Sequence, residues 1–444
     1  IFDLEEDIRL NMQASIGKKM NFNLNYNTES TFSFDANQFK LAYQGDEDEI
    51  IKHIEAGNVS MTTGSSLIKG GSALFGIKTK LQFGKLNVTA LLAKQESSSK
   101  TVSSKGGVTK RQFEIMADQY DENRHFFLAQ YFRDTYDQNM SKLPLIASGI
   151  EITKIEVWVT NKRSAYDNAR NILAFEDLGE AEKKGNSHWV SSSSTGLPEN
   201  DANSLYDEIT TQYSSIRNIA NVTTTMTALD GFGISGGKDY EKIESARMLN
   251  ASEYTLNSKL GYLSLKSRLD DDMVLAVAFQ YTKGGRTYQV GEFSTDDAGN
   301  SDQTLVVKLL KATSGDPSIP LWDLMMKNVY AIGANSLQQT SFNLQIQYMS
   351  DTVGVFTNYI KEGPIADQLL LKVMNLDRLN ANNESYADGR FDFVEDYTVY
   401  ASSGRIIFPV VEPFGSHLAS KLGNKALADR YCYQELYDST LTQA

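Results

Sequence analysis

The feature that most constrains this chain is a strict alternation of apolar and polar residues along its first hundred positions. Apolar side chains occupy every second position from 8 to 16 and again from 20 to 26, on either side of Gly17-Lys18-Lys19. A period of two places alternate side chains on one face of a β-strand. With those three residues as the turn, we predict an antiparallel hairpin with one wholly apolar face. Its predicted pairs are Ile16 with Met20, Ala14 with Phe22, Met12 with Leu24 and Leu10 with Tyr26.

A second hairpin is predicted between residues 77 and 92, where the two-residue turn Gly84-Lys85 separates two alternating runs. Its predicted pairs are Phe83 with Leu86, Leu81 with Val88, Thr79 with Ala90 and Ile77 with Leu92. The opposite face is polar, with Leu91 as the exception. We expect strands of roughly nine or ten residues, the length that crosses a bilayer at a strong tilt.

Two interpretations of this alternation stay open. A soluble antiparallel sheet with one face on a core shows the same pattern. The polar positions are rich in Asn, Gln, Ser and Thr, and the chain has only 7 prolines, which favours strands of a transmembrane barrel wall. Aromatic residues near the predicted strand ends are candidates both for interfacial anchors and for core positions: Tyr26, Phe32, Phe34 and Tyr43.

Composition excludes several classes of function. With 43 Lys and Arg against 56 Asp and Glu, the net charge is −13 and no basic cluster is present, so nucleic-acid binding is excluded. The single cysteine, Cys432, allows neither an intrachain disulfide nor a multi-cysteine metal site. No apolar run reaches the roughly 18 residues of a transmembrane helix, although this test does not detect transmembrane strands. The chain begins at Ile1 without an initiator methionine, and we interpret it as part of a longer protein.

The rest of the chain has a different sequence pattern. A Ser/Lys/Gly loop, residues 101–111, follows the hairpin region 1–100. Beyond it, a weak internal repeat aligns residues 254–265 with residues 397–408. We predict two related α+β extramembrane units, residues 112–290 and 305–444. Within them the patterns favour strands over 113–120, 152–159 and 342–348, and aromatic amphipathic helices over 126–136 and 321–330.

A search for catalytic and metal-binding patterns finds no set of residues with the complete pattern of a catalytic or metal site. Ser235 fits the nucleophile motif G-x-S-x-G, but the same glycines also fit G-x-G-x-x-G, so we interpret the stretch as a flexible turn. His125, beside Asp121, is expected to be a hydrogen-bonded structural residue. The acidic stretches Asp270–Asp272 and Asp296–Asp302 lack the EF-hand spacing and are read as solvated turns, with cation binding left open. We expect no catalytic residue, no cofactor and no metal.

Several longer stretches resemble one known family. Residues 120–134 read YDENRHFFLAQYFRD, and residues 404–415 read GRIIFPVVEPFG. Further matching stretches lie at 45–51, 54–60, 74–78, 81–86, 155–161, 260–265, 322–330 and 374–380. These strings are similar to the N-terminal region of the SprA/Sov family, the outer-membrane translocon of the Bacteroidetes type IX secretion system.

The resemblance implies a function without catalytic residues. It implies part of a very large barrel in the cell outer membrane that exports folded proteins carrying a C-terminal type IX signal and, in some relatives, gliding adhesins. The implied partners are a PorV-type shuttle barrel, a periplasmic plug protein, the secreted cargo, outer-membrane lipid and, indirectly, an inner-membrane motor. A chain of 444 residues is a small part of such a protein, so it cannot close the pore alone.

The resemblance leaves two alternatives of other classes. A soluble cell-surface adhesin or peptide-binding module, whose sheets recognise a partner by strand addition, fits the same alternation. An ester hydrolase using Ser235 is the third reading. We therefore expect a mainly β chain, with barrel-wall strands first and two α+β units after them, and no enzyme activity.

Overall fold

The chain folds as two compact units, residues 1–112 and 113–444, and each is described by itself. The computed structural model describes residues 9–17, 19–27, 38–46, 48–59, 74–94, 112–162, 166, 168–193, 195–296, 302–349, 354–380 and 383–440. The fold is mainly β, with antiparallel pairing predominant. In this described part of the chain, no helix is long and apolar enough to cross a membrane.

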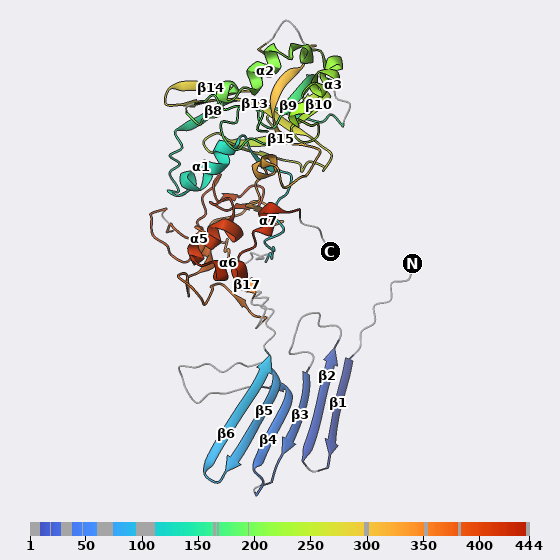
Figure 1. Cartoon of the computed structure of the whole chain (residues 1–444). Coiled ribbons are helices and arrows are strands. Elements are labelled where there is room, and N and C mark those ends of the chain that lie inside the picture. The colour runs from blue at the N-terminus through green and yellow to red at the C-terminus, as the bar shows by residue number, and fades with distance from the viewer. Residues whose placement is uncertain are drawn as a thin grey trace, which may run out of the picture. The chain divides into compact units, whose positions relative to one another are not determined.

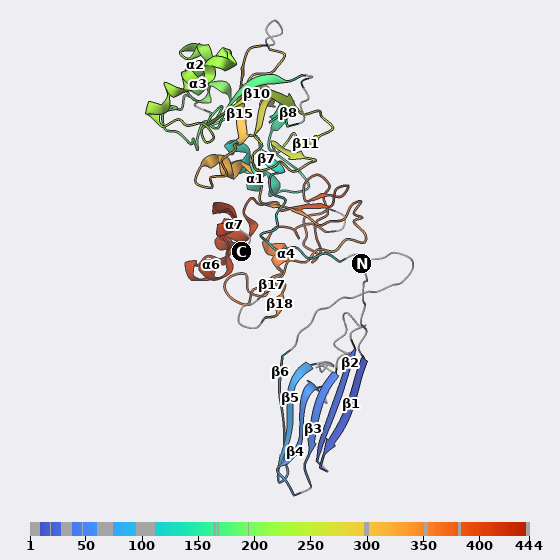
Figure 2. The ribbon, with the colours of Figure 1, turned by 90° about the vertical axis from the view of Figure 1, so that its right-hand side faces the viewer.

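The first unit is a single antiparallel sheet whose six strands lie side by side in chain order (Figures 1 and 2). Its strands are β1 (Arg9–Ile16), β2 (Met20–Asn27), β3 (Gln38–Gln44), β4 (Ile51–Val59), β5 (Leu74–Phe83) and β6 (Leu86–Lys94). The registers of β1 with β2 and of β5 with β6 are those predicted, from Ile16 opposite Met20 to Ile77 opposite Leu92. The alternation and the turns together therefore determine how these strands pair.

Short turns join the strands at one end of this sheet, here called the short-turn end. Gly17 lies between β1 and β2 with φ +65°, and Gly84 lies between β5 and β6 with φ +61°. This left-handed conformation suits glycine, because a side chain there clashes with the following carbonyl oxygen. Residues 45–50 join β3 to β4 at the same end of the sheet. In the sequence, residues 28–37 separate β2 from β3, and residues 60–73 separate β4 from β5.

The largest sheet of the second unit closes on itself as a small barrel. Its strand order is β14-β13-β15-β9-β10-β8, and β8 also pairs with β13 along the whole length of β13. The strands are β8 (Ile150–Val159), β9 (Arg170–Phe175), β10 (Tyr240–Met248), β13 (Leu275–Lys283), β14 (Arg286–Val290) and β15 (Leu305–Lys311). β15 runs parallel to β9, and both strands are almost entirely buried, as parallel strands usually are.

Two three-stranded sheets carry the internal repeat. One has the order β11-β12-β7 and the other β19-β20-β16. Their strands are β7 (His125–Phe127), β11 (Tyr254–Asn257), β12 (Tyr262–Leu265), β16 (Val329–Ala331), β19 (Val399–Tyr400) and β20 (Arg405–Ile407). Leu256 pairs with Leu263 in the first hairpin, and the aligned residues Val399 and Ile406 pair in the second. The sequence repeat therefore corresponds to two hairpins with the same register.

The helices of the second unit are short. They are α1 (Gln130–Met140), α2 (Leu205–Thr211), α3 (Ile219–Thr227), α4 (Leu370–Val373), α5 (Leu418–Leu422), α6 (Lys425–Tyr431) and α7 (Glu435–Asp438). Tighter or irregular turns are η1 (Asn200–Ala202), η2 (Ser214–Arg217), η3 (Asp230–Phe232), η4 (Pro320–Leu324) and η5 (Pro413–His417), and a small hairpin is formed by β17 (Tyr348–Met349) and β18 (Phe356–Thr357). In both ribbon views α2 and α3 lie beside the closed sheet, whereas α5, α6 and α7 lie together elsewhere in the unit.

Several predicted elements differ from the observed ones. The strand over 152–159 is confirmed as β8, but residues 113–120 form no strand. The predicted helix over 126–136 begins only at Gln130, because Phe126 and Phe127 pair with β12. Residues 321–330 form η4 and then β16, because Tyr330 pairs with Ile406.

The predicted strand over 342–348 survives only at Tyr348, in β17. Phe342 instead packs in an aromatic cluster, with ring centroids 5.9 Å from Phe113 and 5.4 Å from Phe391. Alternating burial therefore arises here without strand pairing. β15, at the start of the predicted unit 305–444, pairs with β9 and β13 of the predicted unit 112–290.

Candidate functional site

The first unit presents a sheet face made almost wholly of apolar side chains, here called the apolar face. Cross-strand register puts one residue from every strand into each row of this face, for example Ile16, Met20, Tyr43, Ile54, Thr79 and Ala90. The next row contains Ala14, Phe22, Leu41, Ala56, Ile77 and Leu92. Two shorter rows pair Leu81 with Val88 and Phe83 with Leu86.

Large side chains of the apolar face are open to the surroundings. Leu92 is 78% exposed, Ile16 65% and Ile77 50%. Burying one such side chain stabilises a fold by about 1.5–3 kcal/mol, and a water-soluble sheet normally gains this by covering its apolar face. A contiguous exposed apolar surface of this kind marks contact with a membrane or another protein.

The opposite face of the same sheet is polar and carries a network of charges. Glu55 of β4 lies at its centre, with its Oε1 3.0 Å from Lys40 Nζ and 2.9 Å from His53 Nε2. Lys78 Nζ of β5 lies 4.0 Å from Glu55 Oε2. Ser15 Oγ donates to Asn21 Oδ1 at 3.1 Å across the first hairpin. The sheet therefore has one apolar face and one polar, charged face.

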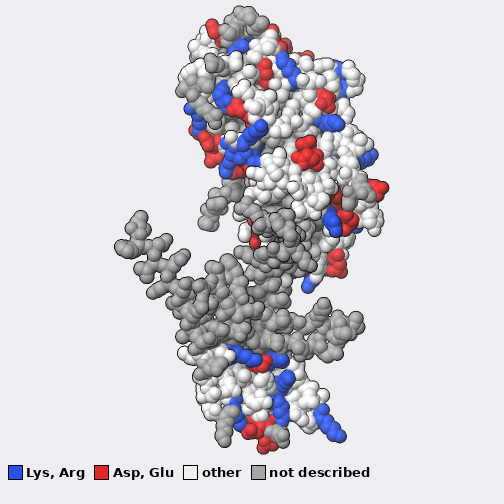
Figure 3. All heavy atoms as spheres, turned by 180° about the vertical axis from the view of Figure 1, so that it is seen from behind, with Lys and Arg blue, Asp and Glu red and all other residues white. Residues whose placement is uncertain are grey.

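The short-turn end of the sheet is charged, and one aromatic residue links it to the apolar face. Tyr43 lies in an apolar row, and its hydroxyl donates to Glu49 Oε2 at 2.8 Å. Lys19 Nζ lies 2.6 Å from Glu49 Oε1 and 2.6 Å from Asp46 Oδ2. Figure 3 shows acidic side chains gathered at this end of the sheet. A tyrosine with an apolar ring and a polar tip suits a boundary between hydrocarbon and water.

Tyr26 lies in β2, opposite Leu10, as predicted. Phe32 and Phe34 lie outside the described residues.

In the second unit, His125 is the centre of a buried polar network. Its Nε2 lies 3.1 Å from Asp121 Oδ2, and its Nδ1 lies 2.7 Å from Ser264 Oγ. This is the connectivity of an acid–histidine–serine triad. However, His125 is 1% exposed and Ser264 is 7% exposed, so a substrate cannot reach the hydroxyl without opening the core. Arg405 Nε also donates to Asp121 Oδ2 at 2.7 Å.

The charges of this network indicate a structural role. Burial alone would raise the pKa of Asp121, but hydrogen bonds from His125 and Arg405 outweigh burial and lower that pKa to about 2. Burial lowers the pKa of His125, although the hydrogen bond and the negative charge of Asp121 raise it and so offset part of this effect. The network joins β7, β12 and β20, and Tyr262 and Tyr400 add a hydroxyl contact of 3.0 Å between the two hairpins. It therefore connects the two copies of the repeat.

A second buried cluster, Glu176, Asp177 and Glu180, follows β9 and was not anticipated from the sequence. Glu180 Oε1 accepts from Lys308 Nζ of β15 at 2.9 Å and from the Gln130 backbone N–H of α1 at 3.0 Å. Asp177 accepts from the N–H groups of Gly185 and Asn186. The available signal was an acidic run directly after a buried strand, since such carboxylates need partners.

The protonation of this cluster differs from that of free carboxylates. Burial, with a further contribution from the negative charge of Asp177, raises the pKa of Glu176 to about 8. Burial also raises the pKa of Asp177 to about 6, against the hydrogen bonds from Gly185 and Asn186. Glu176 Oε1 accepts from the Leu321 N–H at 2.9 Å, at the start of η4. The raised pKa of Glu176 favours its protonated form near neutral pH, and the cluster ties the starts of α1 and η4 to the closed sheet.

The residues singled out for chemistry in the sequence are not brought together. Ser235 Oγ donates to Asp239 Oδ2 at 3.0 Å, within its own turn. Two further histidines also have protein partners: His188 contacts Glu208, and His417 contacts the Val373 carbonyl oxygen. Among the described residues, no group of three or more His, Cys, Asp or Glu side chains has an arrangement that could hold a metal ion.

The two acidic stretches have protein partners where they are described. Lys162 Nζ lies 3.1 Å from Asp270 Oδ2 and also contacts Asp272. Asp296 Oδ2 accepts from the Phe293 N–H and from Gln289, each at 3.0 Å. Residues 297–301 lie outside the described part.

Comparison with known protein families gives a match over the N-terminal part of the chain. A family model described as a motility-related or secretion protein matches residues 1–283, from the start of the chain to the end of β13. A search of the curated proteins finds no match to the chain. The matched range covers well over half of the chain and includes the apolar face, His125 with Asp121 and Ser264, and the first copy of the repeat.

Proposed function

Because the chain belongs to the SprA_N family of motility-related secretion proteins, we propose that its first unit is part of the wall of the type IX outer-membrane translocon. The observation that carries this proposal is the exposed apolar face opposite a polar, charged face on one antiparallel sheet. Strands of a membrane barrel have this two-sided character, with apolar side chains toward lipid and polar side chains toward the lumen.

The lengths of β4, β5 and β6 support the proposal. β4, β5 and β6 have nine, ten and nine residues. A strand that crosses the hydrocarbon core at a tilt needs about 9–11 residues. The charged turns and Tyr43 then fit the level of the lipid headgroups.

The distribution of turns suggests an orientation. In outer-membrane barrels the short turns face the periplasm and the longer connections face outward. In the proposed wall, the turns 17–19, 45–50 and 84–85 are therefore periplasmic.

The proposal gives the chain a transport role and no catalytic reaction. The polar faces of such wall strands line a pore through which folded cargo with a C-terminal type IX signal, including gliding adhesins, leaves the cell. A PorV-type shuttle barrel, a periplasmic plug and, indirectly, an inner-membrane motor are the proposed partners. The alternative, a soluble cell-surface adhesin or peptide-binding module, requires another protein surface to cover the apolar face.

A charge placed on the apolar face tests the proposal. Ile77→Arg puts a guanidinium near the middle of β5, where the lipid-facing position costs about 2–4 kcal/mol. Thr89→Arg, on the polar face of β6, is the matched control. In the native cells, we expect the first variant to lose both outer-membrane protein and exported cargo, and the second to keep both. Equal export by the two variants would contradict the wall assignment.

A further inference from the structure

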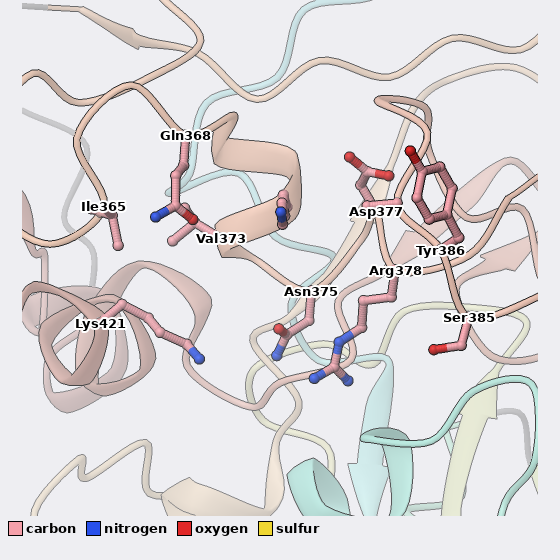
Figure 4. Close-up of a pocket in the computed structure, with 11 residues that line it drawn as sticks. Ile365, Gln368, Val373, Asn375, Asp377, Arg378, Ser385, Tyr386 and Lys421 are labelled. Atoms are coloured by element: carbon pink, nitrogen blue, oxygen red, sulfur yellow. The ribbon is translucent and has the colours of Figure 1, made fainter.

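A pocket of about 640 Å³ in the second unit belongs to no feature described so far (Figure 4). It lies between α4, the loop that follows α4, and α5. Lys421 extends toward it from α5, and Arg378, Ser385 and Tyr386 border it from the loop (Figure 4). A pocket of this volume accommodates a small molecule or a few residues of a peptide.

The lining of this pocket is positively charged. Lys372 of α4, Arg378 and Lys421 contribute three cations, against one carboxylate, Asp377. Asp377 Oδ1 accepts from the N–H groups of Asp388 and Gly389 at 3.0 and 3.1 Å, so it is bound within its own loop. Neither lysine ammonium group has a hydrogen-bond or ion-pair partner among the described residues. The two lysines are therefore available to a ligand.

The charge of the pocket contrasts with that of the unit around it. The first 112 residues contain slightly more basic than acidic residues, so the whole acidic excess lies in residues 113–444. Figure 3 shows charges of both signs dispersed over the visible face of this unit. His417 contacts the carbonyl oxygen of Val373, which lines the pocket. Burial lowers the pKa of His417 against this hydrogen bond, and the positive charges of Lys421 and Arg378 lower it further. A local positive field thus persists within an acidic unit.

From these observations, we propose that the pocket binds a short acidic peptide segment, an inference that goes beyond the transport role and does not depend on it. The lysines come from two separate helices, which suits carboxylates spaced along a chain. Gln368 and Asn375 line the same pocket and offer amide groups to a peptide backbone. Tyr386, 71% exposed, gives apolar contact for an intervening side chain.

The geometry favours carboxylates over a phosphate. Phosphate sites concentrate converging backbone N–H groups or a free guanidinium fork on one point. Here Arg378 Nη1 already donates to the Ser141 carbonyl oxygen at 2.7 Å, and the other cations are lysines. Lysine acts as a mobile point charge, which suits a flexible acidic segment.

Fluorescence anisotropy of a labelled hexapeptide of alternating Asp and Ala, titrated with the full chain in a zwitterionic detergent, tests this proposal. The same peptide with Asn in place of Asp is the neutral probe. We expect binding of the acidic probe alone, weakened about tenfold by the double change Lys372→Gln and Lys421→Gln. Both lysines are exposed, so the fold does not depend on them.

Two further variants sharpen the result. Lys259→Gln, at an exposed lysine in the β11–β12 turn, removes the same charge elsewhere and should leave binding unchanged. Replacing both pocket lysines by arginine should restore binding. Equal binding of the neutral probe, or undiminished binding by the double glutamine variant, would overturn the proposal. Displacement of the acidic probe by pyrophosphate at concentrations at which free aspartate has no effect would also overturn it, in favour of a phosphate site.

Discussion

The turns of the two repeated hairpins depend on glycine for two reasons. Gly261 and Gly404 have φ values of +65° and +61°, a conformation that side chains rarely adopt. A Cβ on Gly261 would also lie 2.2 Å from Cδ1 of Phe132, a buried residue of α1. The glycine thus lets the first hairpin approach the helix closely.

Gly261→Ala should therefore destabilise the second unit more than a comparable change elsewhere. Gly284, in the β13–β14 turn, has φ +59° and no atom within 4 Å of an added Cβ, so it is the matched control. We expect Gly284→Ala to cost about 1 kcal/mol and Gly261→Ala to cost about 1–3 kcal/mol more. Urea denaturation monitored by near-ultraviolet circular dichroism measures the difference. Equal costs would show that the Phe132 contact does not matter.

Glu176 should make stability depend on pH. Burial, then the charge of Asp177, raise its pKa from 4.5 to about 8, so between these values the folded state holds a proton that the unfolded state has released. Stability from this group is therefore lost as pH rises, by about 1.4 kcal/mol per pH unit for one proton. Lys327 acts in the opposite sense, because burial lowers its pKa to about 7.

The comparison of wild type with Glu176→Gln isolates the first effect, because Lys327 is present in both proteins. Between pH 6.5 and 7.5, Asp177, with a pKa of about 6, is mostly ionised. We expect the wild-type unfolding free energy to fall relative to the variant over this range, in urea titrations at several pH values. If the unfolding free energy of wild type minus that of the variant stays constant or rises with pH, Glu176 does not hold a proton in the folded state.

At the scale of residues, sequence reasoning recognised some features and missed others. The expectation of a hydrogen-bonded His125 agrees with its contact to Asp121, four positions away. Its other partner, Ser264, lies 139 positions away, and Arg405 lies 284 positions from Asp121. No local pattern links residues so far apart, because only the pairing of β7 with β12 and of β16 with β20 brings them together.

At the scale of elements, pattern and turn length determined the hairpins of the first unit. One residue of slippage would exchange the apolar and polar faces, so the register is strongly specified. Elements that form through distant pairing were mispredicted, as in residues 321–330, where pairing of Tyr330 with Ile406 replaces the expected helix. Short segments follow such tertiary contacts more readily than their own helix propensity.

The two repeated hairpins should be energetically coupled through their buried hydroxyl contact. Tyr262 Oη and Tyr400 Oη lie 3.0 Å apart. In a double-mutant cycle with Tyr262→Phe and Tyr400→Phe, we expect a coupling energy of about 0.5–1.5 kcal/mol in urea denaturation. Tyr206→Phe, whose hydroxyl bonds Glu292 instead, should combine additively with Tyr262→Phe. Additivity of the first pair would mean that the hairpins are stabilised independently.

At the scale of the whole molecule, the two units differ in how they use apolar residues. The second unit has a large buried apolar core, with Trp158, Trp189 and Tyr136 at 1% exposure or less. The first unit leaves Met12, Ile16, Ile77 and Leu92 exposed on one face of its sheet. The alternation alone could not decide between a soluble sheet and a membrane wall. The open apolar face and the family match together favour the wall.

The most direct test of the central claim, that the apolar face meets lipid, uses single cysteines in the protein in outer-membrane vesicles. Ile77→Cys and Leu92→Cys report on the apolar face, and Lys80→Cys and Thr89→Cys on the polar face, in a Cys432→Ser background. Each cysteine carries a fluorophore that is exposed to acyl-chain-bound nitroxide or to aqueous iodide. We predict quenching by nitroxide at the first pair and by iodide at the second. Iodide quenching at all four sites, or no quenching at the first pair by either agent, would contradict the account.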